Sequence, residues 1–343
     1  MIGAEMVGVG DAWEDFQALA DDRGWGDGLP LVPPTRERVE TMLGVESDTR
    51  NESLGRVPPS WREATREAVA VNSVMAGCSP DVFPVVCAAV SATLEPSFNL
   101  YGIQATTNPV APLIVVNGPR RDWLRLNGGT NAFGPGWQSN ATLGRALRLV
   151  HSNIGDAKPW GNDRATHGFP AKFTFCAAEN EEMSPWEPLH VERGFAPTDT
   201  VVTVMGIQAF HNVVEFIATE PDEILASLAA NMAVPGTNNV SYGGEPVLVI
   251  APEHARLIGD GGLTKSDVKR RLFEWARCDL SGVPEPTRDM LRSRRPRWAD
   301  LANWPICDRA EDLMVLVVGG TGTHAVFLPT FGPTTAVSRV VSF

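Results

Sequence analysis

Four segments in the first half of this chain recur in the same order in its second half. The members of each pair share apolar content and spacing: 80–94 with 221–233, 112–129 with 246–262, 141–155 with 263–278, and the run around Phe175 with the run around Leu316. A chance match of four elements in one order is uncommon, so the pattern predicts two related helix–strand–helix–strand halves.

The apolar runs indicate how these halves fold. Continuous runs such as 111–119 and 313–319 are typical of strands buried on both faces in a parallel sheet. Between them lie helical patterns, one of which, 264–277, opens with Thr264 and Asp267 in a capping-box arrangement. We therefore predict an α/β fold of two repeated helix-strand-helix-strand halves around mainly parallel sheets.

The predicted halves set the domain boundaries. Residues 1–60 form a loop-rich N-terminal extension, 61–215 the first half with inserted loops, and 216–343 the second half. A duplicated fold offers a cleft where its halves meet, and inserted loops commonly line such clefts.

Composition excludes several classes of protein. The net charge of −12 makes nucleic acid and anionic membranes poor partners. The 5 cysteines contain no CxxC pair, which argues against a disulfide framework or a structural zinc site. The first residues lack the basic and apolar regions of a signal peptide, so we expect a cytoplasmic location. We also expect a homo-oligomer.

The densest chemistry lies in the segment 173–195. A short apolar run leads directly into carboxylates and a histidine, and such strand ends deliver side chains to clefts in α/β folds. A solvated loop is the alternative for the individual glutamates. The catalytic candidates here are Cys176, Glu181, Glu182 and His190, with the carboxylates and the imidazole moving protons.

Further residues of this region could bind a substrate or a metal. Arg193 could clamp a carboxylate, and His211 follows a strand and could join it. His190, Glu192 and His211 together could ligate a divalent cation, although their spacing matches no strong metal motif. The sequence thus leaves the cofactor open between none and a divalent metal.

A loop rich in glycine and asparagine, 127–140, precedes a helix that carries Arg145 and Arg148. The two arginines lie one turn apart near the start of this helix, which suits an anionic substrate, so we expect Asn131, Asn140 and Arg145 to contact it. The alternative is an ordered loop with structural caps. A second glycine turn, 319–322, lacks the lysine of a phosphate loop and predicts a tight turn that brings His324 to the sheet edge.

Cys78 is the remaining catalytic candidate. It follows Gly77 at a helix end and precedes Pro80, which opens the next helix, so the helix dipole is expected to lower the pKa of its thiol. Asp81 opposes that effect. A buried structural thiol is the alternative. We expect Asn131, Asn140, Arg145, Cys176, Glu181, His190 and Arg193 to converge on one pocket.

Several segments resemble a bacterial family whose members are often encoded beside, or fused to, a small protein with a Cys-Gly-Ser-Cys or selenocysteine-Gly-Ser-Cys motif. They are DGLPLVPPT (27–35), MAGCSPD (75–81), NAFGPG (131–136), FTFCAAENEEMSPWEPLHVERGF (173–195) and GGTGTHAVFLPTFG (319–332). The likeness covers nearly the whole chain, which departs from the pattern at Asn108, Trp137 and Phe169. No CGSC occurs here, so the chain resembles the large component alone.

The resemblance implies redox or thiol chemistry shared with a small CGSC or UGSC partner protein. The resulting hypothesis is the large component of a thiol-linked two-component oxidoreductase or group-transfer enzyme that acts on a small anionic substrate. Two alternatives stay open: a metal-dependent lyase or hydrolase, and a non-catalytic scaffold subunit.

Overall fold

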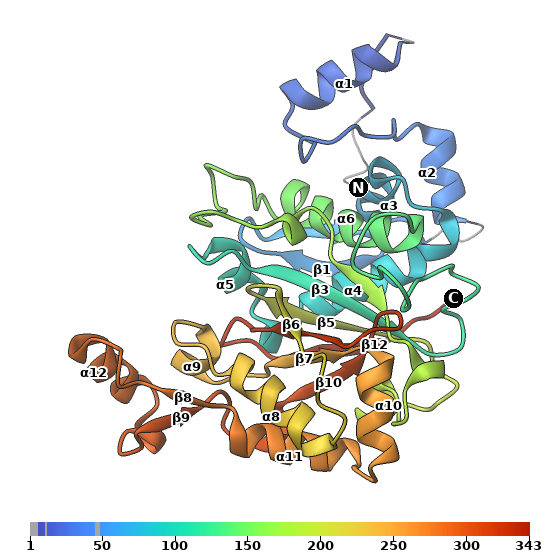
Figure 1. Cartoon of the computed structure of the whole chain (residues 1–343). Coiled ribbons are helices and arrows are strands. Elements are labelled where there is room, and N and C mark those ends of the chain that lie inside the picture. Colours follow the sequence, from blue (N-terminus) through green and yellow to red (C-terminus); the bar gives the residue numbers. More distant parts are fainter. Residues whose placement is uncertain (1–5, 11, 45–48) are drawn as a thin grey trace.

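The computed structural model describes residues 6–10, 12–44 and 49–343, and its centre is built from two β-sheets that lie face to face. Helices cover the outer face of each sheet, which gives four layers in the order helix, sheet, sheet, helix (Figure 1). The mixed α/β class predicted from the sequence is confirmed.

The first sheet has the strand order β12-β5-β3-β4. Its strands are β3 (Ala111–Asn117), β4 (Cys176–Ala178), β5 (Val201–Ile207) and β12 (Val337–Val340). β3 runs parallel to β4 and antiparallel to β5, and β12 runs antiparallel to β5. Three helices pack on the outer face: α3 (Arg66–Ala76), α4 (Phe83–Thr93) and α6 (Gln138–Asn153).

The second sheet has the strand order β10-β7-β11-β6. Its strands are β6 (His211–Val214), β7 (Val247–Ile250), β10 (Met314–Val317) and β11 (His324–Leu328). β7 runs parallel to β10 and antiparallel to β11, which also pairs antiparallel with β6. The outer helices are α8 (Pro221–Met232), α10 (Pro252–Asp260) and α11 (Lys265–Trp275), and α11 opens with the expected capping box between Thr264 and Asp267.

The prediction of mainly parallel sheets is wrong, because each four-stranded sheet is mixed, with one parallel and two antiparallel pairs. Along β3, Leu113 and Val115 face the other sheet while Ile114 and Val116 face the helices. A continuous apolar run therefore indicates that both faces of a strand are buried. In a four-layer stack antiparallel strands are buried in this way as well as parallel ones.

Each sheet has one edge strand that comes from the other predicted half of the sequence. β6 lies in the predicted first half but pairs with β11 of the second sheet, and β12 lies in the predicted second half but pairs with β5 of the first sheet. The chain therefore crosses between the sheets on both sides of the predicted boundary at 215. Neither sheet is complete without a strand from the other half.

The remaining elements do not belong to the two four-stranded sheets or to the helices named above. The N-terminal extension holds α1 (Trp13–Asp22) and α2 (Arg36–Leu43), and the Thr35 side chain caps α2. The other elements are β1 (Ser53–Val57), β2 (Arg62–Thr65), α5 (Leu100–Ala105), α7 (Leu189–Glu192), α9 (Asn238–Tyr242), β8 (Arg277–Asp279), α12 (Glu285–Arg294) and β9 (Asn303–Pro305).

Among the described residues, no single helix combines the length and the apolar character needed to cross a membrane. One bent pair, Pro80–Thr93 with Pro96–Ala105, meets those two criteria jointly.

Candidate functional site

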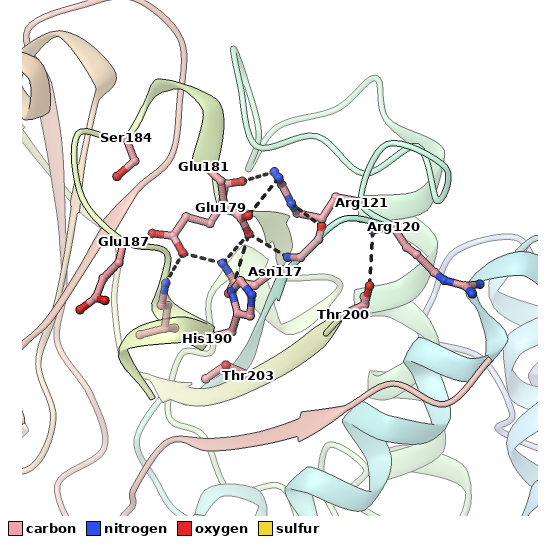
Figure 2. A network of polar contacts seen from close by, with 12 residues as sticks. Asn117, Arg120, Arg121, Glu179, Glu181, Ser184, Glu187, His190, Thr200 and Thr203 are labelled. Carbon is pink, nitrogen blue, oxygen red and sulfur yellow. Dashed lines mark hydrogen bonds and ion pairs between the residues drawn. The ribbon is translucent and has the colours of Figure 1, made fainter. Parts of the chain in front are cut away.

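Polar side chains meet where the parallel strands β3 and β4 end (Figure 2). Asn117 is the last residue of β3, and Glu179 follows β4 directly. The Asn117 Nδ2 group donates to Glu179 Oε2 at 2.6 Å and to Glu181 Oε1 at 2.9 Å. Because parallel strands end at the same edge of a sheet, two segments 62 residues apart form one network.

Glu179 is the most deeply buried carboxyl group of this network. Its Oε2 atom also accepts a hydrogen bond from the Leu189 backbone N–H at 2.8 Å, whereas Oε1 is buried with no hydrogen-bond partner among the described residues. Burial raises the pKa of this carboxyl group, against the smaller opposing effect of the Lys265 charge. Glu179 is thus the group of the network best suited to keep a proton.

Arg121 neutralises the two glutamates that follow. Its Nη2 atom lies 2.7 Å from Glu182 Oε1 and 3.1 Å from Glu181 Oε2, and Nη1 donates to the Glu179 carbonyl at 2.8 Å. The hydrogen bond from Arg121 holds the pKa of Glu182 below its usual range. Both predicted catalytic glutamates are therefore ion-pair partners of one arginine, which fixes them in place.

His190, in α7, is buried beside this cluster. Its Nδ1 atom lies 4.0 Å from Glu181 Oε1, and neither ring nitrogen has a hydrogen-bond partner among the described residues. Burial lowers the pKa of the imidazole, although the Glu181 carboxylate acts in the opposite direction. Burial thus favours the neutral form of His190.

A cavity of about 920 Å³ opens elsewhere, between the two sheets. The first sheet contributes the loop 130–135 and the segment 169–176, and the second contributes the ends of β7 and β10 and the start of β11. The sequence predicted a cleft where the two halves meet, and the observed cavity lies between the two sheets. None of the described residues that line it is Lys, Arg, Asp or Glu.

The glycine turn after β10 lines this cavity, with His324 beside it. Gly319 (φ +119°) and Gly322 (φ +153°) adopt backbone conformations that other residues rarely reach, which explains the glycines. His324 opens β11, as the sequence predicts for a tight turn at the sheet edge. Asn180 connects the turn to the network, because its Nδ2 donates to the Gly319 carbonyl at 3.1 Å.

The predicted thiols are not set up to react. Cys78 Sγ donates to the Thr142 carbonyl at 3.3 Å, and burial raises its pKa to about 12, opposite to the predicted direction. The following turn is a short 3₁₀ segment, so α4 starts only at Phe83 and its dipole gives little help. Cys176 borders the cavity, but its side chain packs in the helix-facing core, and burial raises its pKa too.

The predicted substrate-binding residues divide between different places. Asn131 and Asn140 line the cavity, but the amide of Asn140 is fully used by the backbone of Asn127 and Ala132. Arg145 forms a two-pronged ion pair with Asp27 of the N-terminal extension, both bonds 2.8 Å long. Arg193 donates to the Ala336 carbonyl at 2.9 Å.

The seven residues expected in one pocket are therefore not all brought together. Asn131, Asn140 and Cys176 border the cavity, whereas Glu181 and His190 belong to the Arg121 network. The Asn/Gly loop did turn out to line a cleft. Its arginine faces away from the cleft because Asp27, far away in the sequence, satisfies its charge.

The residues proposed for a metal are also separated. Glu192 is paired with Lys265 at 2.8 Å and with Lys269, His190 lies beside Glu181, and His211 is exposed on the edge strand β6. Across the part of the chain that the structure describes, no three His, Cys, Asp or Glu side chains are grouped to hold a metal ion.

Sequence reasoning missed Asn117, Arg121 and the phenylalanines of the cavity. Asn117 carried a usable signal, since it is the polar residue that closes a predicted strand. The phenylalanines gave no such signal, because apolar residues in loops are most simply interpreted as packing against the core.

Comparison with known proteins gives no assignment. No family model matches the chain, and no curated protein matches it closely enough to count as a relative. Function has to be inferred from the site.

Proposed function

We propose that this chain is the large component of a two-component enzyme that acts on a small organic molecule bound between its two sheets, with the reacting thiols supplied by a small CGSC- or UGSC-type protein. The observation that carries the proposal is the cavity of about 920 Å³ to which both sheets contribute. Its volume falls in the range of small-molecule sites.

The state of the chain's own cysteines supports an external thiol. Burial raises the pKa of all five, to about 12 for Cys78, Cys87 and Cys307 and about 11 for Cys278, with Cys176 shifted in the same direction. A thiolate is the reactive form of cysteine, so these thiols stay inert near pH 7. In the redox form of the proposal, the partner's dithiol becomes a disulfide and the bound molecule gains the two electrons and two protons released.

His324 is the cavity residue best placed to move a proton. It is the single histidine among the described residues that line the cavity, and it is exposed at the start of β11. Its Nδ1 atom lies 3.5 Å from Asn212 Nδ2, and its ring meets Phe216 edge-on at 5.7 Å between centroids. In this proposal His324 takes the part that the sequence assigned to His190.

Two features support the finer predictions on architecture and assembly. The sheets share one pattern, in which β3, β4, β5 and β12 correspond to β7, β10, β11 and β6 in order and in pairing sense, and we propose that the chain arose by duplication. We also propose a homo-oligomer, supported by Phe216 (67% exposed) and Ile217 (87% exposed) just after the edge strand β6.

The test is reconstitution with a purified CGSC protein and a panel of small organic molecules. We expect disulfide formation in the partner only when both the chain and a substrate are present. Turnover by the isolated chain, or activity that follows added metal, would favour the lyase or hydrolase alternative. Binding of both partners without turnover would favour the scaffold alternative.

A matched pair of histidine variants sharpens this test. His324→Gln removes the proton donor of the cavity and should lower the rate by about 100-fold or more. His211→Gln changes an exposed histidine on neighbouring β6 that does not line the cavity, so its rate should stay near that of the parent chain. Equal effects of the two variants would remove His324 from the mechanism.

A further inference from the structure

The first-sheet wall of the cavity is aromatic. Phe169, Phe175, Phe133 and Phe210 form a continuous row of edge-to-face contacts, with centroid distances of 6.4, 5.5 and 5.7 Å in that order. Phe175, inside the row, is buried, and Phe210, at one end of it, is 44% exposed. The row thus reaches the surface at Phe210, and all four phenylalanines line the cavity.

The second-sheet wall is aliphatic and built from small residues: Val249, Ala251, Val318, Ala325 and Val326. Small side chains opposite a row of rings leave room for a flat guest. An aromatic guest gains stacking and edge contacts with phenylalanine beyond the gain from burying its area.

The lining limits the charge that a guest can carry. Since none of the described residues that line the cavity is Lys or Arg, a guest with several negative charges would lose its hydration without a cationic partner. The sequence-based expectation of arginine-held anions therefore does not fit this cavity. Arg145 and Arg193 are bound to Asp27 and to the Ala336 carbonyl instead.

One end of the cavity can accept a single anionic group. The backbone N–H groups of Gly320, Thr321 and Gly322 donate to no acceptor among the described residues, and all three residues line the cavity. Successive free N–H groups in a turn form an anion-binding concavity, and His324 stands next to them.

From these walls we infer that the cavity binds a planar aromatic molecule with one carboxylate, its ring against the Phe133–Phe175 row and its carboxylate at the Gly320–Gly322 turn. This inference rests on the proposed function for its biological meaning, but the binding itself can be tested without turnover. Aryl carboxylates are the chemical class it names.

The test measures the binding of small ligands to the full chain. Binding is monitored by the ¹⁹F NMR signal of 4-fluorophenylacetate and by calorimetry. We expect phenylacetate to bind more tightly than cyclohexylacetate, which has a similar size but no ring current or flat face, and more tightly than phenylacetamide, which lacks the charge. Succinate and inorganic phosphate should not compete. Equal affinity for the cyclic aliphatic acid, or competition by succinate, would overturn the inference.

Paired phenylalanine variants locate the site. Phe133→Leu removes the ring that joins two neighbours in the row, so we expect affinity for phenylacetate to fall by about threefold to tenfold. Phe98→Leu is the control, because Phe98 is buried in the core beneath the first sheet and does not line the cavity. It should lower stability and leave affinity unchanged. Equal loss of affinity in both variants would place the ligand elsewhere.

The two proposals fail in different ways. Aryl carboxylate binding without thiol-dependent turnover would refute the proposed function and leave this inference standing. Thiol-dependent turnover of a non-aromatic substrate, with no binding of phenylacetate, would refute this inference and leave the proposed function standing.

Discussion

At the scale of single residues, hydrogen-bond partners decide which protonation state a buried group can adopt. His151 is fully buried in α6, where its Nε2 faces Thr93 Oγ1 at 3.1 Å and its Nδ1 faces Gln104 Nε2 at 3.0 Å. The Thr93 hydroxyl donates to the Val90 carbonyl, so Nε2 carries the ring proton and Nδ1 accepts from Gln104. A second proton, on Nδ1, would point at the Gln104 Nε2 group, which is itself a hydrogen-bond donor.

His151 therefore predicts a loss of stability in acid. Burial lowers its pKa from 6.5 to about 3, so between those pH values the unfolded chain binds a proton that the folded chain does not. The free energy of unfolding should fall with decreasing pH in this window, by about 1.4 kcal/mol per pH unit from this residue. Urea unfolding of the parent chain and of His151→Gln at several pH values measures this effect. The difference between their free energies of unfolding should narrow as pH falls. A constant gap would contradict the assignment.

Glu179 predicts the opposite pH dependence. Its folded-state pKa is raised, so its contribution is fully present at low pH and is lost as pH rises through the folded pKa. Glu179→Gln can keep both hydrogen bonds to its carbonyl oxygen and place its amide N–H₂ at the unpartnered Oε1 position. Relative to the parent chain, the variant should become more stable as pH rises from 5 to 8 in urea unfolding. A difference that does not change with pH would mean that Glu179 is ionised throughout.

The cysteines predict low reactivity. Because burial raises the pKa of Cys78 and Cys87 alike, iodoacetamide should modify the two at similar slow rates in the native chain, as peptide mapping would measure. Cys78→Ser can keep the hydrogen bond to Thr142, so we expect it to retain fold and activity. Fast, selective labelling of Cys78 would instead indicate that this chain supplies the catalytic thiol.

At the scale of elements, the N-terminal extension is attached to α6 by one buried ion pair. Arg145 and Asp27 are paired at 2.8 Å with side chains that are 13% and 9% exposed, and Arg145 also donates to the Leu29 and Pro30 carbonyls. The same arginine was expected to bind substrate. Its position about two turns into α6 is compatible with both roles, and only the path of the extension decides between them.

Breaking this pair should loosen the extension around Asp27. Asp27→Ala leaves a buried arginine without its counter-charge, so we expect a loss of about 3 kcal/mol in the free energy of unfolding and faster proteolysis near residues 24–31. Asp21→Ala on the exposed face of α1 is the control and should change stability little. Similar stability of the two variants would show that the ion pair contributes little.

At the scale of the whole molecule, the exchange of β6 and β12 makes the two sheets depend on each other. β12 is close to the end of the sequence but completes the first sheet beside β5, where Thr203 Oγ1 and Ser338 Oγ lie 2.8 Å apart. The halves defined by sequence order are thus not the units defined by hydrogen bonding.

Deletion of residues 336–343 tests this dependence. Removing β12 exposes an edge of β5, so we expect hydrogen exchange to accelerate in β5 and β3, which lie over a hundred positions earlier in the sequence, before it does in β7 and β10. Loss of protection confined to β10 and β11, the strands nearest in sequence, would contradict the exchange of strands.

Local patterns determined much of this protein. Apolar periodicity and the Thr264–Asp267 capping box predicted helices and strands near their observed positions, because capping and one-face burial depend on residues a few positions apart. The strand-end rule also led to Glu181, Glu182 and His190 as members of one polar cluster, which the structure describes around Arg121.

Tertiary structure decided the rest. Strand direction, the exchanged edges, the aromatic wall from Phe169 to Phe210, the pairing of Arg145 with Asp27 and the contact of Cys78 with Thr142 all depend on contacts between segments far apart in the chain. A sequence shows which side chains can be buried or charged. Whether a given thiol is desolvated or a given arginine is already paired depends on what the fold packs against it, and that is a property of the assembled layers.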